Sequence, residues 1–231
     1  MNSIENFLNN PVYYALVSGN ADMSKGSEQV KFFDLEVSPF AGFSIDYQKG
    51  FDELHQLLPK GRRILYATRK GIPVPGGWSL RGHIPGSQFL FTGKEEFDND
   101  FSGLVPLQTR HVEQMVNLAL LTKPGPFDSR TIEFGNYQGI FESDKLVAMT
   151  GRRLHVYDHI EVSAVCTHPD HLGKGYAAKL LKHQINSILA ENSIPFLHVR
   201  SDNERAIALY KRLGFKESGD MHFYFLQKED C

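Results

Sequence analysis

One stretch, residues 161–181, constrains the fold more than any other part of the chain. It opens with a short run of β-branched and small apolar residues, 161–166, which is typical of a buried strand. Pro169 ends that run, because proline has no N–H to give to a neighbouring strand. Apolar residues then recur at helical spacing and predict an amphipathic helix over 176–190. The sequence therefore predicts a strand, a tight loop and a helix in direct succession.

Two glycines, Gly173 and Gly175, lie in the loop just before this helix. The first N–H groups of a helix have no partner within it and lie at the positive end of the helix dipole, so they favour an anion. Because glycine has no Cβ, an anion can approach the backbone closely at both positions. The pattern predicts a site for a diphosphate group.

The segment HLGKGYA, 171–177, resembles the pyrophosphate loop of the GNAT superfamily of N-acetyltransferases, whose usual pattern is Gln/Arg-x-x-Gly-x-Gly/Ala. Leu172 departs from this pattern at its first position, where the family contributes mainly a backbone amide. A later segment, SDNERAIALYKRLGF at 201–215, is similar to the family's Asn-x-x-Ala-x-x-Leu-Tyr-x-x-x-Gly-Phe. The two segments follow each other in the family's order, and the resemblance covers roughly the last half of the chain.

This resemblance implies a mixed α/β (α+β) fold with a GNAT-like central mixed sheet flanked by helices. The implied co-substrate is acetyl-CoA or another short acyl-CoA, without a metal ion, and an amine would attack it directly in a ternary complex. Backbone N–H groups would hold the pyrophosphate, the central strand would pair with the pantetheine arm, and a main-chain N–H near Val165 or Cys166 would polarise the thioester carbonyl. The residues implied in cofactor binding are Val165, Cys166, Thr167, Leu172, Gly173, Lys174, Gly175, Tyr176, Ala177, Asn203 and Tyr210.

Tyr210 and Glu161 are the candidate catalytic residues. Tyr210 lies at helical spacing with apolar residues such as Ala206 and Leu213, as a core aromatic would. The resemblance instead places it beside the sulfur of the cofactor, where its phenol can protonate the departing thiolate. Glu161 opens the central strand, either as a carboxylate that faces solvent or, as in part of the family, as the base that deprotonates the amine.

The glycine loop is also compatible with other roles. Residues 173–178 satisfy Gly-x-Gly-x-x-Gly/Ala, the dinucleotide-binding fingerprint, and Asp202 ends the next strand, where a ribose-binding acid is expected. Two features argue against a nicotinamide dinucleotide: residues 167–172 separate the strand from the first glycine, and the preceding strands are predicted to be antiparallel. Two further alternatives are a purely structural turn and a CoA-binding or interaction protein without activity, which only turnover distinguishes from an enzyme.

Other side chains near the loop also have two interpretations. Cys166 suggests a covalent acyl intermediate, but a nucleophilic cysteine needs an exposed thiolate, and a small residue buried in a strand is the simpler account. The cluster HPDH at 168–171 suggests a metal site, which its proline and the absence of further ligands at usual spacing disfavour. Lys174 is either a cation for the phosphates or a solvated lysine, and Asn203 is a helix cap with or without a contact to the cofactor.

Composition and charge limit the partners of the protein. The net charge of −2 does not suggest a large nucleic-acid surface. The two cysteines form no disulfide framework, the N-terminus lacks the pattern of a secretory signal, and no apolar run is long enough to span a bilayer. We therefore expect a cytoplasmic protein with a small-molecule or peptide amine as acceptor, and with neither nucleic acid nor membrane as partner.

Two domains are predicted, 1–104 and 105–231, because the chain turns acidic and loses its periodicity between 93 and 106. The first is expected to be a smaller α/β domain that shapes the acceptor site. The arrangement resembles tandem glycine N-acyltransferase-like proteins, which would make the first half a degenerate acetyltransferase-like domain. The predicted strands are 30–37, 64–67, 78–84, 87–91, 137–142, 145–150, 159–166, 196–200 and 222–227. The predicted helices are one that starts at Asn10 and Pro11, then 51–58, 109–121, 176–190 and 203–213.

Overall fold

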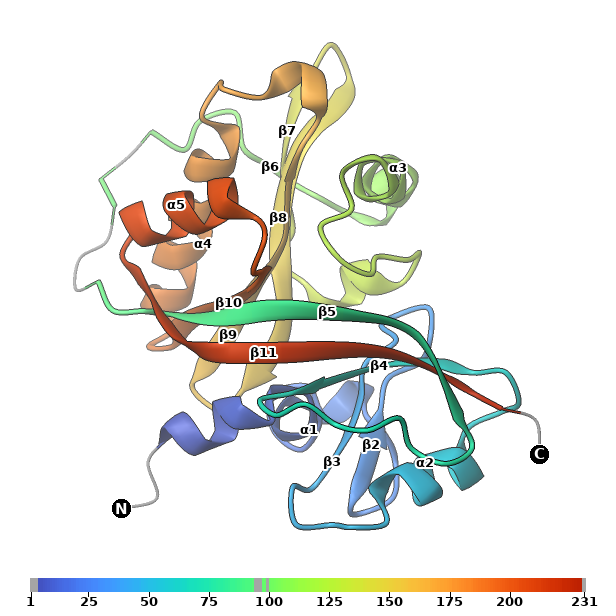
Figure 1. Ribbon diagram of the computed structural model, residues 1–231. Helices are drawn as coiled ribbons and strands as arrows, with labels where there is room; N and C mark the ends of the chain where they lie inside the picture. The colour runs from blue at the N-terminus through green and yellow to red at the C-terminus, as the bar shows by residue number, and fades with distance from the viewer. Residues whose placement is uncertain (1–3, 94–96, 99, 230–231) are drawn as a thin grey trace.

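The computed structural model describes residues 4–93, 97–98 and 100–229 of the 231-residue chain. Its centre is an eight-stranded sheet to which both halves of the sequence contribute (Figure 1). These strands are β4 (Arg63–Thr68), β5 (Trp78–Phe91), β6 (Val105–Pro106), β7 (Gln138–Glu142), β8 (Lys145–Val156), β9 (His159–Thr167), β10 (Ile194–Arg200) and β11 (Phe215–Lys228). A second, three-stranded sheet consists of β1 (Lys25–Gly26), β2 (Val30–Phe32) and β3 (Ala41–Phe43).

Helices lie around the large sheet and beside the small one. The α-helices are α1 (Pro11–Leu16), α2 (Gly50–Leu57), α3 (Val112–Thr122), α4 (Tyr176–Ala190) and α5 (Glu204–Arg212). Short 3-10 helices are η1 (Ile4–Asn9), η2 (Ala21–Met23), η3 (Thr109–His111), η4 (Thr131–Phe134) and η5 (Pro169–His171). No helix in the described part of the chain is both long and apolar enough to cross a membrane.

The large sheet is mixed, in agreement with the predicted fold class. Its order is β4-β11-β5-β10-β9-β8-β7-β6, in which β10 and β9 run parallel and the other neighbours are antiparallel. The strands before the glycine loop, β7 to β9, form the antiparallel meander that their short turns predict. A dinucleotide-binding unit is instead built from repeated parallel βαβ units, so this pairing argues against that ligand.

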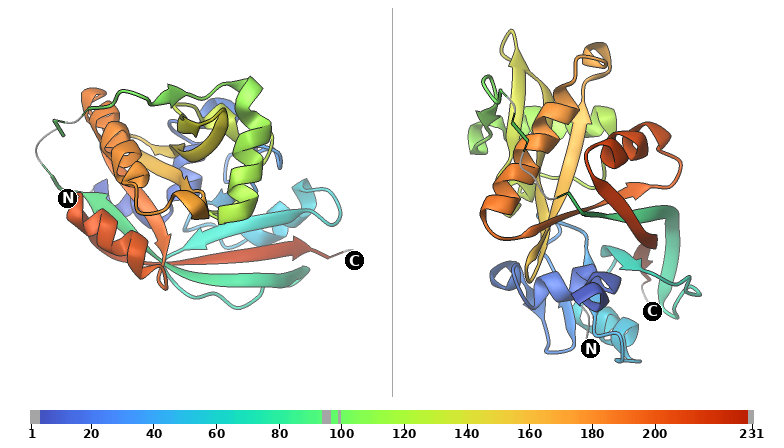
Figure 2. Two further views of the ribbon diagram at one scale, coloured as in Figure 1. Left: turned by 90° about the horizontal axis from the view of Figure 1, so that it is seen from above. Right: turned by 90° about the vertical axis from the view of Figure 1, so that its left-hand side faces the viewer.

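Helices cover both faces of the sheet at β8 and β9 (Figure 2). On one face, Leu181 and Ile185 of α4 pack in the same core as Val162 of β9. On the other face, Met115 of α3 packs in the same core as Cys166 of β9. The two sides of β9 therefore belong to different cores, which is why its sequence reads as a nearly continuous apolar run.

The N-terminal part of the chain shares the large sheet with the C-terminal part. β4 pairs with β11, and β5 lies between β11 and β10, so strands from before and after residue 104 alternate. Phe33 and Phe40, which flank the turn between β2 and β3, share a core with Leu65 of β4 and Leu154 of β8. The division into two domains near residue 104 stays a prediction, and the sheet is continuous across that point.

Several predicted elements agree closely with the structure, and others are wrong at their ends. Helix α4 has the predicted bounds, 176–190. β5 runs unbroken where two strands were predicted on either side of Pro85. The carbonyl of Pro85 accepts the N–H of Ser201, just past the end of β10, so the proline, which has no N–H to donate, lies where the pairing with β10 ends.

Three further predicted bounds are corrected. β2 ends at Phe32 instead of residue 37, because a turn follows in which the Asp34 carbonyl accepts two N–H groups. α3 begins at Val112, since the predicted first turn from Thr109 is a 3-10 helix. β11 already begins at Phe215, because its first half is exposed and polar and carries no apolar alternation that the sequence pattern could reveal.

Candidate active site

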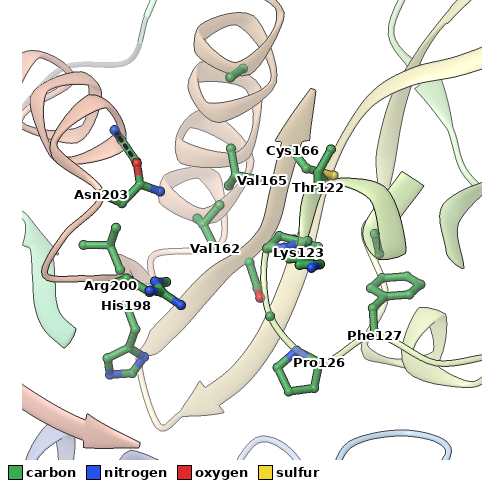
Figure 3. Close-up of a pocket in the computed structure, with 18 of the residues that line it drawn as sticks. Thr122, Lys123, Pro126, Phe127, Val162, Val165, Cys166, His198, Arg200 and Asn203 are labelled. Carbon is green, nitrogen blue, oxygen red and sulfur yellow. Dashed lines mark hydrogen bonds between the residues drawn. The ribbon is translucent and has the colours of Figure 1, made fainter. Parts of the chain in front are cut away.

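A deep cleft opens where β9 and β10 part. The two strands pair in parallel at three positions, the last of which joins Phe196 to Glu161. β9 continues to Thr167 and β10 to Arg200 without further pairing between them in the described structure. A cavity of about 1340 Å³ lies here, lined by both strands, the start of α4 and one side of α5 (Figure 3). The unpaired edge of β9 can therefore bind an extended chain in place of a strand.

A β-bulge at Ala164 sets the direction of the residues along this edge. The register of β9 against β8 skips here, and Val165 has no partner residue in β8. Ala164 has a φ of 52°, a left-handed conformation that is uncommon outside glycine. The extra residue shifts by one position the alternation of side chains between the two faces of the sheet. Val165 therefore packs on the same side as Val162, in the core that contains α4. Ala164 and Cys166 pack on the other side, in the core that contains α3. The main-chain N–H near Val165 or Cys166 that is predicted to polarise the thioester carbonyl thus lies at a bulge.

The glycine loop forms one wall of the cavity. Gly173 and Gly175 have φ angles of 82° and 79°, which residues with a Cβ rarely adopt. A Cβ at either position would have no heavy atom within 4 Å, and both glycines line the cavity with Leu172, Tyr176 and Ala177. α4 begins at once at Tyr176, so no side chain caps the N–H groups of its first turn. Open space above two glycines at a helix N-terminus fits the diphosphate that the resemblance implies.

Lys174 is turned away from this wall. Its ammonium pairs with Glu142 at 2.9 Å and does not line the cavity. The Tyr176 hydroxyl donates to the same carboxylate, and these hydrogen bonds lower the pKa of Glu142 to about 2. The structure therefore does not bring the predicted Lys174 cation to the diphosphate site, and Glu142 instead anchors the loop to β7.

Tyr210 lies in the core and on the cavity at once. The residue is 7% exposed, its ring packs edge-on against Phe215, and it lines the cavity. Burial, with a smaller contribution from Cys166, raises the pKa of Tyr210 to about 12. Its hydroxyl makes no hydrogen bond with the described residues, so the phenol is a protonated donor with an unused O–H at neutral pH. Asn203 also lines the cavity and caps α5 by accepting the N–H of Ala206 at 3.2 Å.

Cys166 and Thr167 complete the wall formed by β9. Burial raises the pKa of the Cys166 thiol to about 11, so it is not a thiolate at neutral pH and does not suit a nucleophile. The Thr167 hydroxyl is buried without a hydrogen-bond partner among the described residues, and Thr167 lines the cavity. A buried hydroxyl without a partner is costly, and a bound ligand beside β9 could satisfy it.

Glu161 lies beneath the cleft and not in its lining. Its side chain is fully buried, and one carboxylate oxygen is 2.6 Å from Arg153 Nη2 and 2.7 Å from His198 Nδ1. The other oxygen accepts Arg153 Nε at 2.8 Å and the N–H of Leu154 at 3.3 Å. Burial alone would raise the pKa of Glu161, but Arg153 and His198 together hold it well below its ordinary range. The predicted base is thus a saturated carboxylate that anchors Arg153 and His198 and faces no acceptor.

His198 and Arg153 are site residues that the sequence did not reveal. Both line the cavity, and His198 Nε2 lies 2.9 Å from the side-chain nitrogen of Gln88, which also donates to the Leu8 carbonyl. His198 Nε2 therefore accepts, and its Nδ1–H donates to Glu161. Burial lowers the pKa of His198, so the ring is neutral. No short motif joins these residues, because their contacts span 8 to 110 positions of sequence.

The far end of the cavity is lined from the N-terminal part of the chain and from the segment after α3. The former contributes Phe40 from the turn before β3 and Arg63 from β4. The latter contributes Lys123 and Phe127, and in Figure 3 Lys123 lies across the opening from His198. The predicted role of the first half in shaping an acceptor site is consistent with this lining and stays a prediction.

Comparisons with known sequences agree on the second half of the chain. The family model described as FR47-like protein matches residues 137–225. A curated relative, the N-alpha-acetyltransferase RimI of Mycobacterium tuberculosis, is 32% identical over 65 residues, which are 28% of this chain. The match spans 40% of the length of that relative. The tandem glycine N-acyltransferase-like arrangement stays a prediction.

Comparisons with solved structures extend over nearly the whole chain. A protein from Novosphingobium aromaticivorans, described as an acetyltransferase from the GNAT family, is 30% identical with a TM-score of 0.89, and the match covers 96% of this chain and 99% of that one. A GCN5-related N-acetyltransferase from Kribbella flavida is 13% identical with a TM-score of 0.62, and the match covers 94% of this chain and 95% of that one. At this low identity the similarity supports a shared fold and nothing more.

Proposed function

Because this chain belongs to the GNAT family of acetyltransferases, we propose that it transfers an acetyl or other short acyl group from acyl-CoA to an amine within the cleft between β9 and β10. Transfer from CoA to an amine is the general chemistry of the family, and the role of each residue in it is our proposal for this chain. One observation carries this proposal: the unpaired edge of β9, the two open glycines and Tyr210 line the same cavity. Direct attack by the amine is favoured, because Cys166 is a buried thiol and unsuited to an acyl-enzyme.

At the cofactor end of the cleft, backbone groups would make most of the contacts to CoA, and side chains would make fewer. N–H groups from Leu172 to Ala177 would hold the diphosphate, since the glycines leave space there and the helix dipole favours an anion. The unpaired edge from Val165 to Thr167 would pair with the amide groups of the pantetheine arm as an added strand does. Asn203 lies near enough to the same cavity to contact this arm while it caps α5.

The chemistry would occur at the bulge. A main-chain N–H near Val165 or Cys166 would donate to the thioester carbonyl and stabilise the negative charge that develops on its oxygen. The Tyr210 O–H, with no competing partner among the described residues, would donate its proton to the sulfur as the C–S bond breaks. Each group acts on charge that develops in the transition state, which is where an interaction accelerates the reaction.

The amine needs another route for its proton than the predicted one through Glu161. The four donors around Glu161 leave its carboxylate no contact with the cleft. At the far end of the described lining, Arg63, Lys123 and Arg153 carry positive charge. Nearby positive charges disfavour an ammonium group and lower its pKa. We propose that the acceptor reacts as the free amine and gives its proton to water.

Glu161→Gln is expected to lower stability at pH 7 by about 3 kcal/mol, because it leaves the buried Arg153 without a counter-charge. The folded-state pKa of Glu161 is depressed, so its contribution is present above the unfolded value of about 4.3 and is lost as pH falls below it. Urea unfolding of the variant and the parent should thus show a constant difference between about pH 5 and 8, which shrinks in acid.

The kinetics of the same variant separate an anchor from a base. If Glu161 only anchors Arg153 and His198, kcat/KM of both the parent and the variant should rise with pH as the acceptor amine loses its proton. The apparent pKa of this rise should then change when a different amine is used. A loss confined to low pH, reversed as the free amine accumulates, would instead return the role of base to Glu161.

The proposal is tested by thiol release from acetyl-CoA in the presence of amines, amino acids and peptides, with the acetylated product identified by mass spectrometry. One mole of acetylated amine per mole of free thiol is expected. Calorimetry with acetyl-CoA, NADH and ATP accompanies the assay. Tight acetyl-CoA binding without turnover on any acceptor would favour the inactive CoA-binding protein, and tighter binding of NADH than of every acyl-CoA would contradict the cofactor.

A further inference from the structure

The acceptor end of the cleft is cationic. None of the described residues in the cleft lining is aspartate or glutamate. Arg63 and Lys123 line this end, and the side chain of neither makes a hydrogen bond or ion pair with the described residues. A polyamine, or another acceptor with a second ammonium group, would meet the like charges of these cations here, with no carboxylate among the described lining residues to offset them. An acceptor with an anionic group is complementary to this surface.

Arg153 presents a donor to this end of the cleft. The guanidinium uses Nε and Nη2 on Glu161, at 2.8 Å and 2.6 Å. Its third nitrogen, Nη1, has no hydrogen-bond partner among the described residues, although the side chain is only 13% exposed. Nη1 lies beside Gly125, where an added Cβ would still be 3.7 Å away. Glu161 and the packing thus fix the plane of the guanidinium and leave one N–H edge for a ligand.

The position of Arg153 relates this donor to the proposed reaction. Arg153 lines the main cleft with Ser163 and Ala164 of β9 and with Gly125 and Pro126, and the same residues border an adjoining recess of only about 10 Å³, so a ligand would reach Arg153 from the main cleft. Ala164 is the residue of the bulge, at which the thioester carbonyl is proposed to lie. A carboxylate on Nη1 would therefore hold an amine that is one carbon away beside the reacting group, as positioning of an acceptor requires.

The rest of this end is apolar. The Phe40 ring lies 4.8 Å from Arg153 Cζ, and Ile84, Phe127 and Phe225 also line the cleft. An aromatic or aliphatic side chain would bury apolar surface against these residues. From the free Arg153 edge, the unpaired cations and this lining we infer that the acceptor is an amine bearing a carboxylate and an apolar side chain, as an apolar α-amino acid does. The inference rests on the proposed acyl transfer.

The first test compares acceptors that differ in the carboxylate alone. Phenylalanine, phenylalaninamide and phenethylamine are assayed with acetyl-CoA and the parent protein, and kcat/KM is expressed per free amine so that differences in the deprotonated fraction cancel. A charge-assisted contact to Arg153 predicts a preference for phenylalanine over both others on the order of 10- to 100-fold. Spermidine is expected to be the poorest acceptor. Equal values for phenylalanine and its amide, or a preference for spermidine, would overturn the inference.

The second test removes the Nη1 edge while it keeps the charge that Glu161 needs. A lysine in Arg153→Lys has a single ammonium and cannot serve Glu161 and a substrate carboxylate with the geometry of a guanidinium. The preference for phenylalanine over its amide should fall to within about threefold of unity, through KM for the acceptor, while acetyl-CoA binding is unchanged. The matched control is Arg81→Lys, since Arg81 is exposed, pairs with Gln227 and lies outside the cleft.

The outcomes distinguish this inference from the function on which it rests. Turnover of some amine without a carboxylate preference would overturn the inference and keep the acyl transfer. No turnover with any amine would remove both. A purely structural Arg153 predicts that Arg153→Lys lowers stability and all rates alike and leaves the preference intact. If the variant does not fold, calorimetry of phenylalanine and its amide on the CoA-saturated parent decides, because equal affinities contradict the inference.

Discussion

Tyr210→Phe is expected to lower kcat on the order of 10²–10⁴-fold, the range typical of a positioned acid or base, while the protein stays folded and binds acetyl-CoA normally. The ring and its packing against Phe215 are kept, and the deleted hydroxyl has no partner among the described residues, so its removal leaves no unsatisfied group. Loss of kcat without loss of ground-state binding identifies an interaction made in the transition state. The measurement is steady-state thiol release, with calorimetry of acetyl-CoA and thermal unfolding of each protein.

The control for this prediction is Tyr66→Phe. Burial raises the pKa of Tyr66 to about 12, as it does for Tyr210, but Tyr66 does not line the cleft. The same chemical change should therefore leave kcat unchanged. Because the pKa of Tyr210 is about 12, we also expect no loss of rate through its ionisation below about pH 11. A Tyr210→Phe enzyme that turns over like the parent, on an acceptor for which chemistry limits the rate, would leave this tyrosine a core aromatic.

Gly175→Val is expected to weaken acetyl-CoA binding by at least ~10²-fold, since a branched Cβ would stand where the diphosphate approaches and would displace two or more charge-assisted hydrogen bonds of about 1.5–3 kcal/mol each. The space that valine would occupy is open in this structure, with no atom within 4 Å of a Cβ. Steric conflict within the protein is thus small, and the backbone strain at a φ of 79° is the main cost to stability. Calorimetry with CoA and acetyl-CoA measures the loss.

Gly103→Val is the control that measures the effect of backbone strain alone, without an effect on CoA binding. Gly103 has a φ of 78°, a Cβ there would also meet no atom within 4 Å, and it lies outside the cleft. Both variants should lose similar stability in thermal unfolding, and only Gly175→Val should lose CoA. Undiminished affinity in a folded Gly175→Val protein would show that the glycines serve the turn alone.

The sequence predicts those parts of the site whose conformation depends on interactions between residues close together in the chain. The glycines at 173 and 175 and the helix 176–190 follow from backbone freedom, helix start signals and apolar spacing within some twenty residues, and the structure has them as predicted. Tyr210, Thr167 and Asn203 line the cavity because they lie at fixed offsets from such elements.

The fate of Glu161 could not be predicted in the same way. Its position at the start of a strand is compatible with a base, and its role depends on whether its oxygens are free. Arg153 and His198 lie 8 and 37 positions away and meet Glu161 through the register of β8 and β10 with β9. No local pattern encodes that register, so burial and saturation of the carboxylate appear only in the folded protein.

The sequence also could not predict which strands pair with the N-terminal strands. β4 and β5 read as strands from their β-branched and aromatic residues, but alternation gives no information about the neighbour. Their pairing with β11 and β10 brings Arg63 and Ile84 to a cleft that is lined mostly by residues after 118. The acceptor end is therefore a product of long-range pairing.

The structure of the protein with bound CoA tests most directly the claim that the space between β9 and β10 is the site of acyl transfer. We expect the diphosphate on the N–H groups of residues 172–177, the pantetheine arm along Val165 to Thr167, and the sulfur within hydrogen-bond reach of the Tyr210 hydroxyl. CoA bound elsewhere, or a sulfur remote from both Tyr210 and the bulge at Ala164, would contradict this claim.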